Sequence, residues 1–212
     1  VDASGQVSSR PPSPLDECPD GSRREFEPVL DIHVGILSTS LGPRGGTMIC
    51  SDDDAMLLSR VLEGAPVDTF QDKGFLAWKP EAAEAEPGLH RDADDFAGDL
   101  QQLVVGVGQE GCGYEAQLES WYRFLVDPNP YATIQRNGKD NVPVGTDDAL
   151  LAQRDAFLRP DSLVAIVMLS DENDCSFRAE GPGYLTATPQ HGGMFDKTPR
   201  SECARDPNDP CC

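Results

Sequence analysis

The 212-residue chain carries 17 lysine and arginine residues against 37 aspartate and glutamate residues, a formal net charge of −20. This charge makes nucleic acid and anionic membranes poor partners and favours cations, basic proteins or simple solubility. No stretch is long and apolar enough to span a bilayer, so we expect no transmembrane segment in this chain. The length fits one domain, with room for a small additional lobe.

Cysteine usage indicates an oxidising compartment. The chain has seven cysteines, mostly in predicted loops: Cys18, Cys50, Cys112, Cys175, Cys203, Cys211 and Cys212. No C-x-x-C pair is present, which argues against a zinc ribbon or a thioredoxin-like site. Loop cysteines suit disulfides, so we expect an extracytoplasmic protein, whether secreted, periplasmic or at the cell surface. Because seven is an odd number, at least one thiol lacks a partner within this chain.

The first part of the chain has loop composition with short strands. Residues 1–28 are rich in Pro and Ser and lack periodicity, which predicts a loop insertion or linker. An apolar and at first alternating pattern predicts a strand over residues 29–37, followed by a polar loop. Residues 42–91 are irregular, apart from a brief strand expected at 74–78.

Helices are predicted over three later segments. Residues 92–105 and 113–126 each place their apolar side chains on one face. Residues 147–158 follow Thr146, a suitable N-cap, and end before Pro160.

The most informative stretch runs from Asp161 to Cys175. Its first half is an unbroken apolar run without Gly or Pro, which predicts a strand buried on both faces. Its second half changes abruptly to Ser170-Asp171-Glu172-Asn173-Asp174. The order of strand, helices and strand predicts an α/β fold with a parallel sheet. Ligands bind at the carboxyl edge of such sheets, where this acidic loop would emerge.

Carboxylates in the acidic loop are candidate metal ligands. Asp171, Glu172 and Asp174 offer the oxygen atoms that Mg²⁺ and Ca²⁺ prefer. The spacing does not fit an EF-hand, because the required Gly and closing Glu are missing. A solvated acidic loop that follows a buried strand is the alternative interpretation.

Hydroxyl and glycine positions offer a second set of candidates. Ser38, Thr39 and Ser40 end the first strand and would line the same crevice, although such residues more often begin a turn. Gly113 opens a predicted helix whose amide groups would bind an anion or carboxylate there. Cys112 and Cys175 both lie at the mouth of the proposed crevice, and we expect them to pair, while connectivity stays open on sequence grounds.

Enzyme signatures are missing from the sequence. It contains no G-x-S-x-G elbow, no phosphate-binding loop of the Walker type and no G-x-G-x-x-G motif. His33, His90 and His191 are isolated from one another and from cysteines. We therefore expect a protein that is not an enzyme. The alternative is a metal-assisted hydrolase that uses Asp171 and Asp174.

Three sequence segments resemble the von Willebrand factor A-like (vWA-like) domain family. The likeness is closest to Cys-rich versions in secreted or lipid-anchored surface proteins of myxobacteria and their relatives. The segments are Leu30-Asp31-Ile32-His33-Val34-Gly35-Ile36-Leu37-Ser38-Thr39-Ser40-Leu41-Gly42, Gly111-Cys112-Gly113-Tyr114-Glu115-Ala116-Gln117-Leu118-Glu119, and residues 157–176. They predict a partial vWA-like domain over residues 29–176, followed by a Cys- and Pro-rich loop extension over residues 177–212.

This resemblance implies a doubly wound, Rossmann-like sheet with long disulfide-bearing loops and a metal-ion-dependent adhesion site at its carboxyl edge. Asp171 matches one ligand of that site, whereas the family's D-x-S-x-S motif is absent and its Thr position falls near Cys112. We therefore expect a chain that lacks the first strand and helix of the family. The implied function is adhesion to a protein ligand that presents a carboxylate or a basic surface, with or without Mg²⁺ or Ca²⁺.

Overall fold

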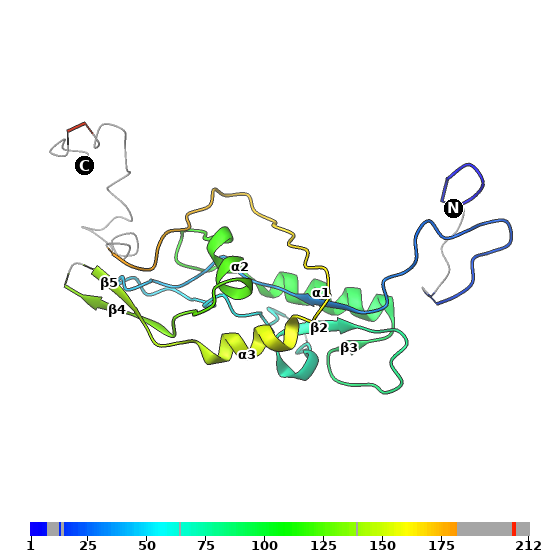
Figure 1. Ribbon diagram of the computed structural model, residues 1–212, viewed down its shortest axis with the longest axis horizontal. Helices are drawn as coiled ribbons and strands as arrows, with labels where there is room; N and C mark the ends of the chain where they lie inside the picture. Colours follow the sequence, from blue (N-terminus) through cyan, green and yellow to red (C-terminus); the bar gives the residue numbers. More distant parts are fainter. Residues whose placement is uncertain (8–12, 14, 64, 139, 182–204, 207–212) are drawn as a thin grey trace. The chain divides into compact units, whose positions relative to one another are not determined.

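The computed structural model describes residues 1–7, 13, 15–63, 65–138, 140–181 and 205–206. The chain divides into two compact units. Unit 1 comprises Val1–Ile36, Leu57–Gly108 and Asp155–Ser162, and unit 2 comprises Leu37–Met56, Gln109–Arg154 and Leu163–Cys212. Helices and strands occur together, so the predicted α/β class is confirmed at this coarse level (Figure 1).

Unit 1 contains a three-stranded sheet in the order β1-β2-β3. Its strands are β1 (Ile32–Gly35), β2 (Phe75–Trp78) and β3 (Leu89–His90). Strands β1 and β2 are antiparallel, whereas β2 and β3 are parallel. The prediction of a parallel sheet is therefore wrong for β1 and β2, the longer of the two strand pairs. The strands predicted at 29–37 and 74–78 are confirmed as β1 and β2.

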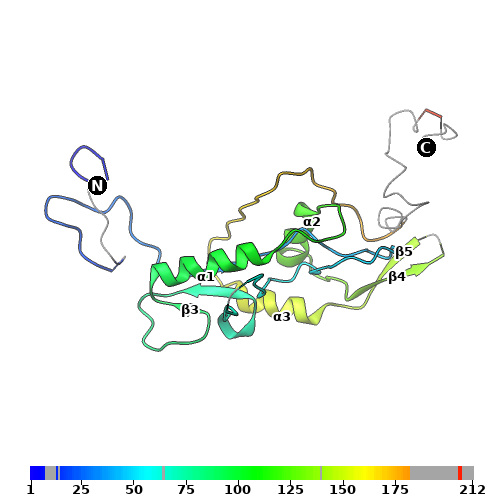
Figure 2. The same ribbon diagram turned by 180° about the vertical axis from the view of Figure 1, so that it is seen from behind.

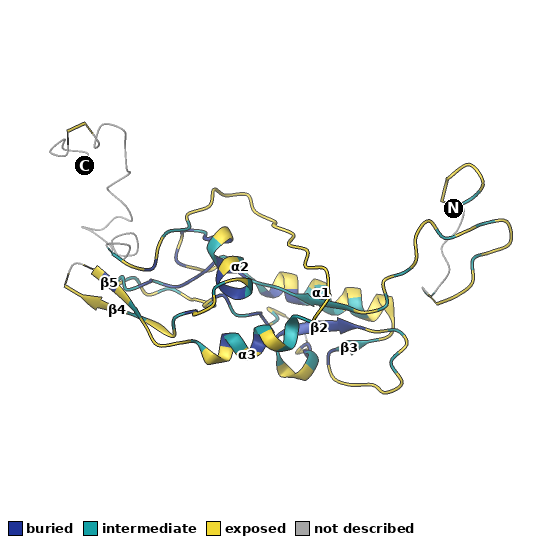
Figure 3. Ribbon diagram, viewed as in Figure 1, coloured by how far each residue is buried: buried dark blue, intermediate teal, exposed yellow. Residues whose placement is uncertain are grey.

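The core of unit 1 lies between this sheet and a helix. All four residues of β2 are buried, as the dark strand in Figure 3 shows. Helix α1 (Ala93–Gly106) runs alongside β2 and β3 in both ribbon views (Figure 2). A buried cluster joins sheet, loop and helix through Leu76, Val67 and Leu103. The Asp92 side chain caps α1 by accepting two backbone N–H groups of the first turn, which satisfies donors that have no partner inside the helix.

Unit 2 contains helix α2 (Gln117–Leu125) and a hairpin of β4 (Thr133–Asn137) and β5 (Asp140–Val144). A third helix, α3 (Asp148–Phe157), follows, and its last three residues are counted with unit 1. A short 3-10 turn, η1 (Phe70–Asp72), completes the elements. The three predicted helices are thus confirmed, α1 with its bounds shifted by one residue and α2 and α3 with shorter bounds, whereas the hairpin and β3 were not predicted.

The N-terminus of α3 departs from the expectation in one detail. Asp147 rather than Thr146 supplies the capping bond, because Asp147 Oδ1 accepts the Leu150 N–H at 3.0 Å. Asp and Thr are both good N-cap residues, and their order in the turn decides which oxygen reaches the free amide.

The expected buried central strand is wrong. Residues 162–170 are extended but belong to no sheet of the described chain, and their side chains are exposed (Figure 3). Strand-like local conformation follows from the β-branched, apolar sequence, whereas burial requires neighbouring strands that no described segment provides. The loop extension predicted from residue 177 lies largely outside the described residues, as do Cys203, Cys211 and Cys212.

Candidate functional site

Three segments chosen from the sequence come together in unit 2. The Thr39 carbonyl accepts the Ala116 N–H at 3.1 Å, and the Ser38 carbonyl accepts the Ser120 hydroxyl at 2.6 Å. On the other side, the Cys175 N–H donates to the Glu115 carbonyl at 2.6 Å. The polar loop after β1, the start of α2 and the acidic loop are therefore neighbours, although they are far apart in the sequence.

The serine hydroxyls of the first segment hold loops together. Ser38 is buried, and its hydroxyl donates to Asp53 Oδ2 at 2.5 Å. Ser40 is also buried and donates to the Ser51 carbonyl at 2.8 Å. Both hydroxyls are thus engaged within the protein. The turn-forming interpretation of this segment fits the geometry better than a ligand-binding one.

Thr39 connects to an acidic group that the sequence did not single out as a site residue. Its hydroxyl donates to the Glu115 carboxylate. Partial burial and the nearby charges of Glu172 and Asp171 raise the pKa of Glu115. Glu115 is therefore within reach of the charges of Asp171 and Glu172, and we call these three residues the acidic rim.

Asp174 has a structural role. Its Oδ1 accepts the Leu118 N–H at 2.9 Å and the Ser176 hydroxyl at 2.7 Å, and Oδ2 accepts the Ser176 N–H at 3.2 Å. Although partial desolvation alone would raise the pKa of Asp174, these hydrogen bonds lower it. Ser176 adds a further bond, since its hydroxyl oxygen accepts the Glu119 N–H at 2.9 Å. The acidic loop thus caps the N-terminus of α2.

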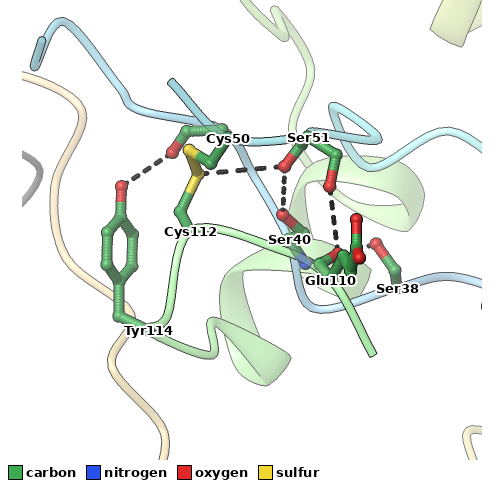
Figure 4. Close-up of a disulfide and its surroundings, with 8 residues drawn as sticks. Ser38, Ser40, Cys50, Ser51, Glu110, Cys112 and Tyr114 are labelled. Atoms are coloured by element: carbon green, nitrogen blue, oxygen red, sulfur yellow. Dashed lines mark hydrogen bonds between the residues drawn. A yellow bond between two sulfur atoms is a disulfide. The ribbon is translucent and has the colours of Figure 1, made fainter. Parts of the chain in front are cut away.

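The expected disulfide between Cys112 and Cys175 is wrong. Cys112 is bonded to Cys50, with a Cα–Cα distance of 5.0 Å (Figure 4), and Cys175 has an exposed free thiol. Ser51 reinforces this link, because its hydroxyl donates to the Glu110 carbonyl at 3.0 Å. The loop that contains Cys50 therefore passes directly beside the loop that precedes α2.

Gly113 and Tyr114 follow the disulfide. Gly113 has φ 74°, in the left-handed region that favours glycine, so it shapes the turn after Cys112. Tyr114 is buried, and its hydroxyl donates to the Gly42 carbonyl at 2.7 Å. Burial raises the pKa of Tyr114 to about 12. Tyr114 therefore ties the segment before α2 to the loop at Gly42.

A buried ion pair also escaped the sequence analysis. The Arg44 guanidinium, which has no exposed side-chain surface, donates to both carboxylate oxygens of Glu119. It also lies over the Phe177 ring, 4.3 Å from the centroid. No local pattern marks Arg44, which lies in a loop of Gly and Pro. The bond to Glu119 raises its pKa against the opposing effect of burial.

Unit 1 has a separate hollow of about 530 Å³, lined in part by His33, Phe70, Lys79 and Arg159. His33 Nδ1 contacts the Phe157 carbonyl at 2.7 Å, and burial lowers the pKa of His33. Asp31 pairs with Lys79 at 3.6 Å and with Arg159, so both cations are neutralised locally. His33 is thus a residue of β1 whose Nδ1 has a hydrogen-bonding partner within unit 1.

The positions of Asp171, Glu172 and Asp174 can be compared with what a metal site requires. Within the described part of the chain, no group of three or more His, Cys, Asp or Glu residues is arranged to hold a metal ion. Asp174 is engaged by its three hydrogen bonds, which leaves Asp171 and Glu172 of the predicted ligand set. The described residues thus give the predicted Mg²⁺ or Ca²⁺ site no support from geometry, and the site stays a prediction.

None of the described helices is both long and apolar enough to cross a membrane. Comparisons of the chain with protein-family models, curated protein sequences and solved structures found no match.

Proposed function

We propose that this chain is a non-enzymatic, extracytoplasmic binding domain of a larger surface protein. It binds a basic surface of a protein partner through the acidic rim of unit 2. The observation that carries the proposal is that the acidic loop lies against Glu115, since the Cys175 N–H donates to the Glu115 carbonyl at 2.6 Å. Burial and, after it, the charges of Glu172 and Asp171 raise the pKa of Glu115. Carboxylates that repel one another gain when a lysine or arginine of a partner approaches them.

The position of the rim supports this proposal. Asp171 and Glu172 are exposed, and the segment that holds them is tied to α2 by Asp174 and Ser176. The disulfide joins the neighbouring loop to the start of α2. Anchored charges lose less conformational entropy on binding than charges on a free loop do. The disulfide also supports the extracytoplasmic location, because such bonds persist mainly in oxidising compartments.

The finer fold assignment remains part of the proposal. A vWA-like, doubly wound domain is supported by the order and spacing of the three sequence segments and by the contacts in unit 2 between the end of the first, the second and the end of the third. The described sheets are smaller than such a fold requires and contain antiparallel pairs. An ion-dependent form of adhesion, with Mg²⁺ or Ca²⁺, makes a distinct prediction in chelator and is tested below.

The test uses a synthetic tetralysine peptide and isothermal titration calorimetry on the full chain. The variant Asp171→Asn/Glu172→Gln removes two rim charges. Its matched control, Glu81→Gln/Glu84→Gln, removes the same charge from exposed positions in unit 1. We expect the rim variant to bind at least tenfold more weakly, because both charge contacts are lost, and the control to bind within about twofold of the wild type.

Equal losses in both variants would show that only the net charge attracts the peptide, and would reject the proposal. Affinity that is unchanged in chelator supports ion-independent binding through the rim. Affinity that disappears in chelator and returns with Mg²⁺ or Ca²⁺ would replace this version by the ion-dependent one.

A further inference from the structure

The apolar segment 163–169 lacks the pairing that its sequence suits. It consists of Leu163, Val164, Ala165, Ile166, Val167, Met168 and Leu169. Within the described part of the chain, none of its backbone N–H or C=O groups takes part in a hydrogen bond. Figure 3 shows the segment as an extended, exposed trace that follows α3.

Side-chain exposure alternates along this segment. On one face, Leu163, Val167 and Leu169 are 94%, 82% and 82% exposed. On the other face, Val164 and Ile166 are 48% and 46% exposed, with Met168 at 57%. A period of two is that of a β-strand, so the segment already has a strand's two faces before any partner strand is present.

Such a segment is a template for strand addition. Exposed aliphatic side chains in a continuous patch mark interaction surfaces, and a row of unpaired backbone groups selects an extended polypeptide. A helix or a small apolar ligand would cover the side chains but leave those backbone groups without partners. Only another extended chain satisfies both requirements.

We propose that segment 163–169 binds an extended strand of a separate polypeptide, which is apolar at alternate positions and carries lysine or arginine beside Asp171 and Glu172. The inference rests on the proposed function, because its partner is the protein that the acidic rim attracts. It adds a second set of contacts made by the backbone of this chain, and these contacts do not depend on the rim carboxylates.

Charge argues for a separate polypeptide rather than a second copy. A second copy has the same net charge of −20 and the same acidic residues after its own apolar segment. Its nearest cation before that segment, Arg159, is already paired with Asp31. A separate strand with basic residues at one end complements the acidic rim. It avoids the repulsion between two acidic copies and supplies the cation that a second copy lacks at this position.

Hydrogen–deuterium exchange on the full chain tests this proposal. The probe is a synthetic ten-residue peptide with two lysines followed by alternating valine and threonine. We expect exchange of the amides in segment 163–169 to slow at least tenfold at saturating peptide. A peptide of the same sequence, N-methylated at every residue so that neither edge can donate a hydrogen bond, is expected to give no such protection.

Substitutions at Val167 separate backbone pairing from side-chain contact. Val167→Pro removes one N–H from an exposed position that makes no hydrogen bond in the free chain, so folding is expected to survive. It should reduce peptide affinity at least tenfold. Val167→Thr keeps the N–H and the β-branched shape, and is expected to retain peptide binding and amide protection. Equal behaviour of the two variants would contradict strand addition.

The remaining outcomes are equally decisive. Peptide binding without protection of segment 163–169 overturns the inference, and so does protection that is already complete in the free chain. Protection that appears only at high protein concentration assigns the surface to a second copy, and protection by phosphatidylcholine vesicles alone assigns it to lipid. If tetralysine binding depends on the rim while the strand peptide gives no protection, the inference fails and the proposed function stands.

Discussion

Asp174 Oδ1 accepts the backbone N–H of Leu118 at 2.9 Å, across 56 positions of sequence. Helix α2 needs this contact, because its own N-cap residue, Ala116, has no side-chain oxygen and makes no capping bond. Ser176 completes the cap through the Glu119 N–H. A loop that reads as a metal site in the sequence therefore stabilises a helix end in the structure.

Removal of this cap should destabilise unit 2. We expect Asp174→Ala to lower the free energy of unfolding by about 1 kcal/mol, the usual cost of losing an N-cap oxygen. Urea denaturation followed by Trp121 fluorescence in a Trp78→Phe background measures the change in α2. Asp171→Ala, in the same loop but without a capping bond, should change stability by less than about 0.5 kcal/mol. Equal effects would remove Asp174 from the capping role.

Asp174 and Glu115 should have opposite effects on the pH dependence of stability. The folded-state pKa of Asp174 lies below its usual value of about 3.9, so its ionised form favours folding. This contribution is present at neutral pH and is lost as the pH falls through the range below about 4. Asp174→Asn should therefore be less stable than the wild type at pH 7, with a difference that shrinks in acid.

The contribution of Glu115 to stability depends on pH in the opposite direction to that of Asp174. Its folded-state pKa lies above the usual value of about 4.3, so its protonated form favours folding. The resulting penalty grows as the pH rises through the range just above that value. Glu115→Gln should be more stable than the wild type at pH 7 and equal to it below about pH 4, by urea denaturation. A gain that is the same at every pH would exclude titration of Glu115 as its cause.

The disulfide should contribute strongly to stability. Cys50 and Cys112 are 62 positions apart. In the chain-entropy model, a disulfide that closes a loop of this length raises the free energy of unfolding by about 4 kcal/mol, because it lowers the entropy of the unfolded chain. We expect Cys50→Ser/Cys112→Ser to lose a comparable amount in urea denaturation, and Cys175→Ser to change little. Peptide mapping without reduction should yield a Cys50–Cys112 linked fragment. A Cys112–Cys175 fragment would contradict the structure.

Glu119→Gln should be one of the more damaging single changes in unit 2. It leaves the buried Arg44 guanidinium without its charged partner, and loss of one member of a buried ion pair typically costs about 3–5 kcal/mol. Urea denaturation of the Trp78→Phe background again gives the free energy. Glu110→Gln, an exposed change in the same unit, serves as the control and should be near neutral. A small loss in Glu119→Gln would show that Arg44 finds another partner.

Two glycines of α1 should respond to alanine with opposite signs. Gly98 is exposed, and a Cβ added there would meet no other segment within 4 Å, so Gly98→Ala should stabilise unit 1 by about 0.5–1 kcal/mol through helix propensity. At Gly106 the added Cβ would lie 2.0 Å from the Arg60 carbonyl oxygen. Gly106→Ala should therefore destabilise by about 1–3 kcal/mol. Thermal unfolding followed by Trp78 fluorescence in a Trp121→Phe background compares the two, and a shift of the same sign in both would contradict this packing.

Local patterns predicted the helices and two of the strands well. The apolar period of α1 and α2 is a property of neighbouring residues, so the sequence located α1 to within one residue and α2 with bounds longer than the structure shows. The hairpin was missed because β4 is mostly polar and exposed and β5 contains Pro143, which strands rarely accommodate. The two-residue strand β3 is too short to show any period.

The sequence by itself determined the acidic character of this protein, its helices, the extended conformation of segment 163–169, and the set of segments that meet in unit 2. Only the tertiary structure decided that Cys112 bonds Cys50, that Asp174 caps α2, and that segment 163–169 is exposed. The physical reason is the range of the interactions. Backbone conformation depends on adjacent side chains, whereas disulfides, remote caps and strand pairing depend on which distant segments approach one another, and no local period records that choice.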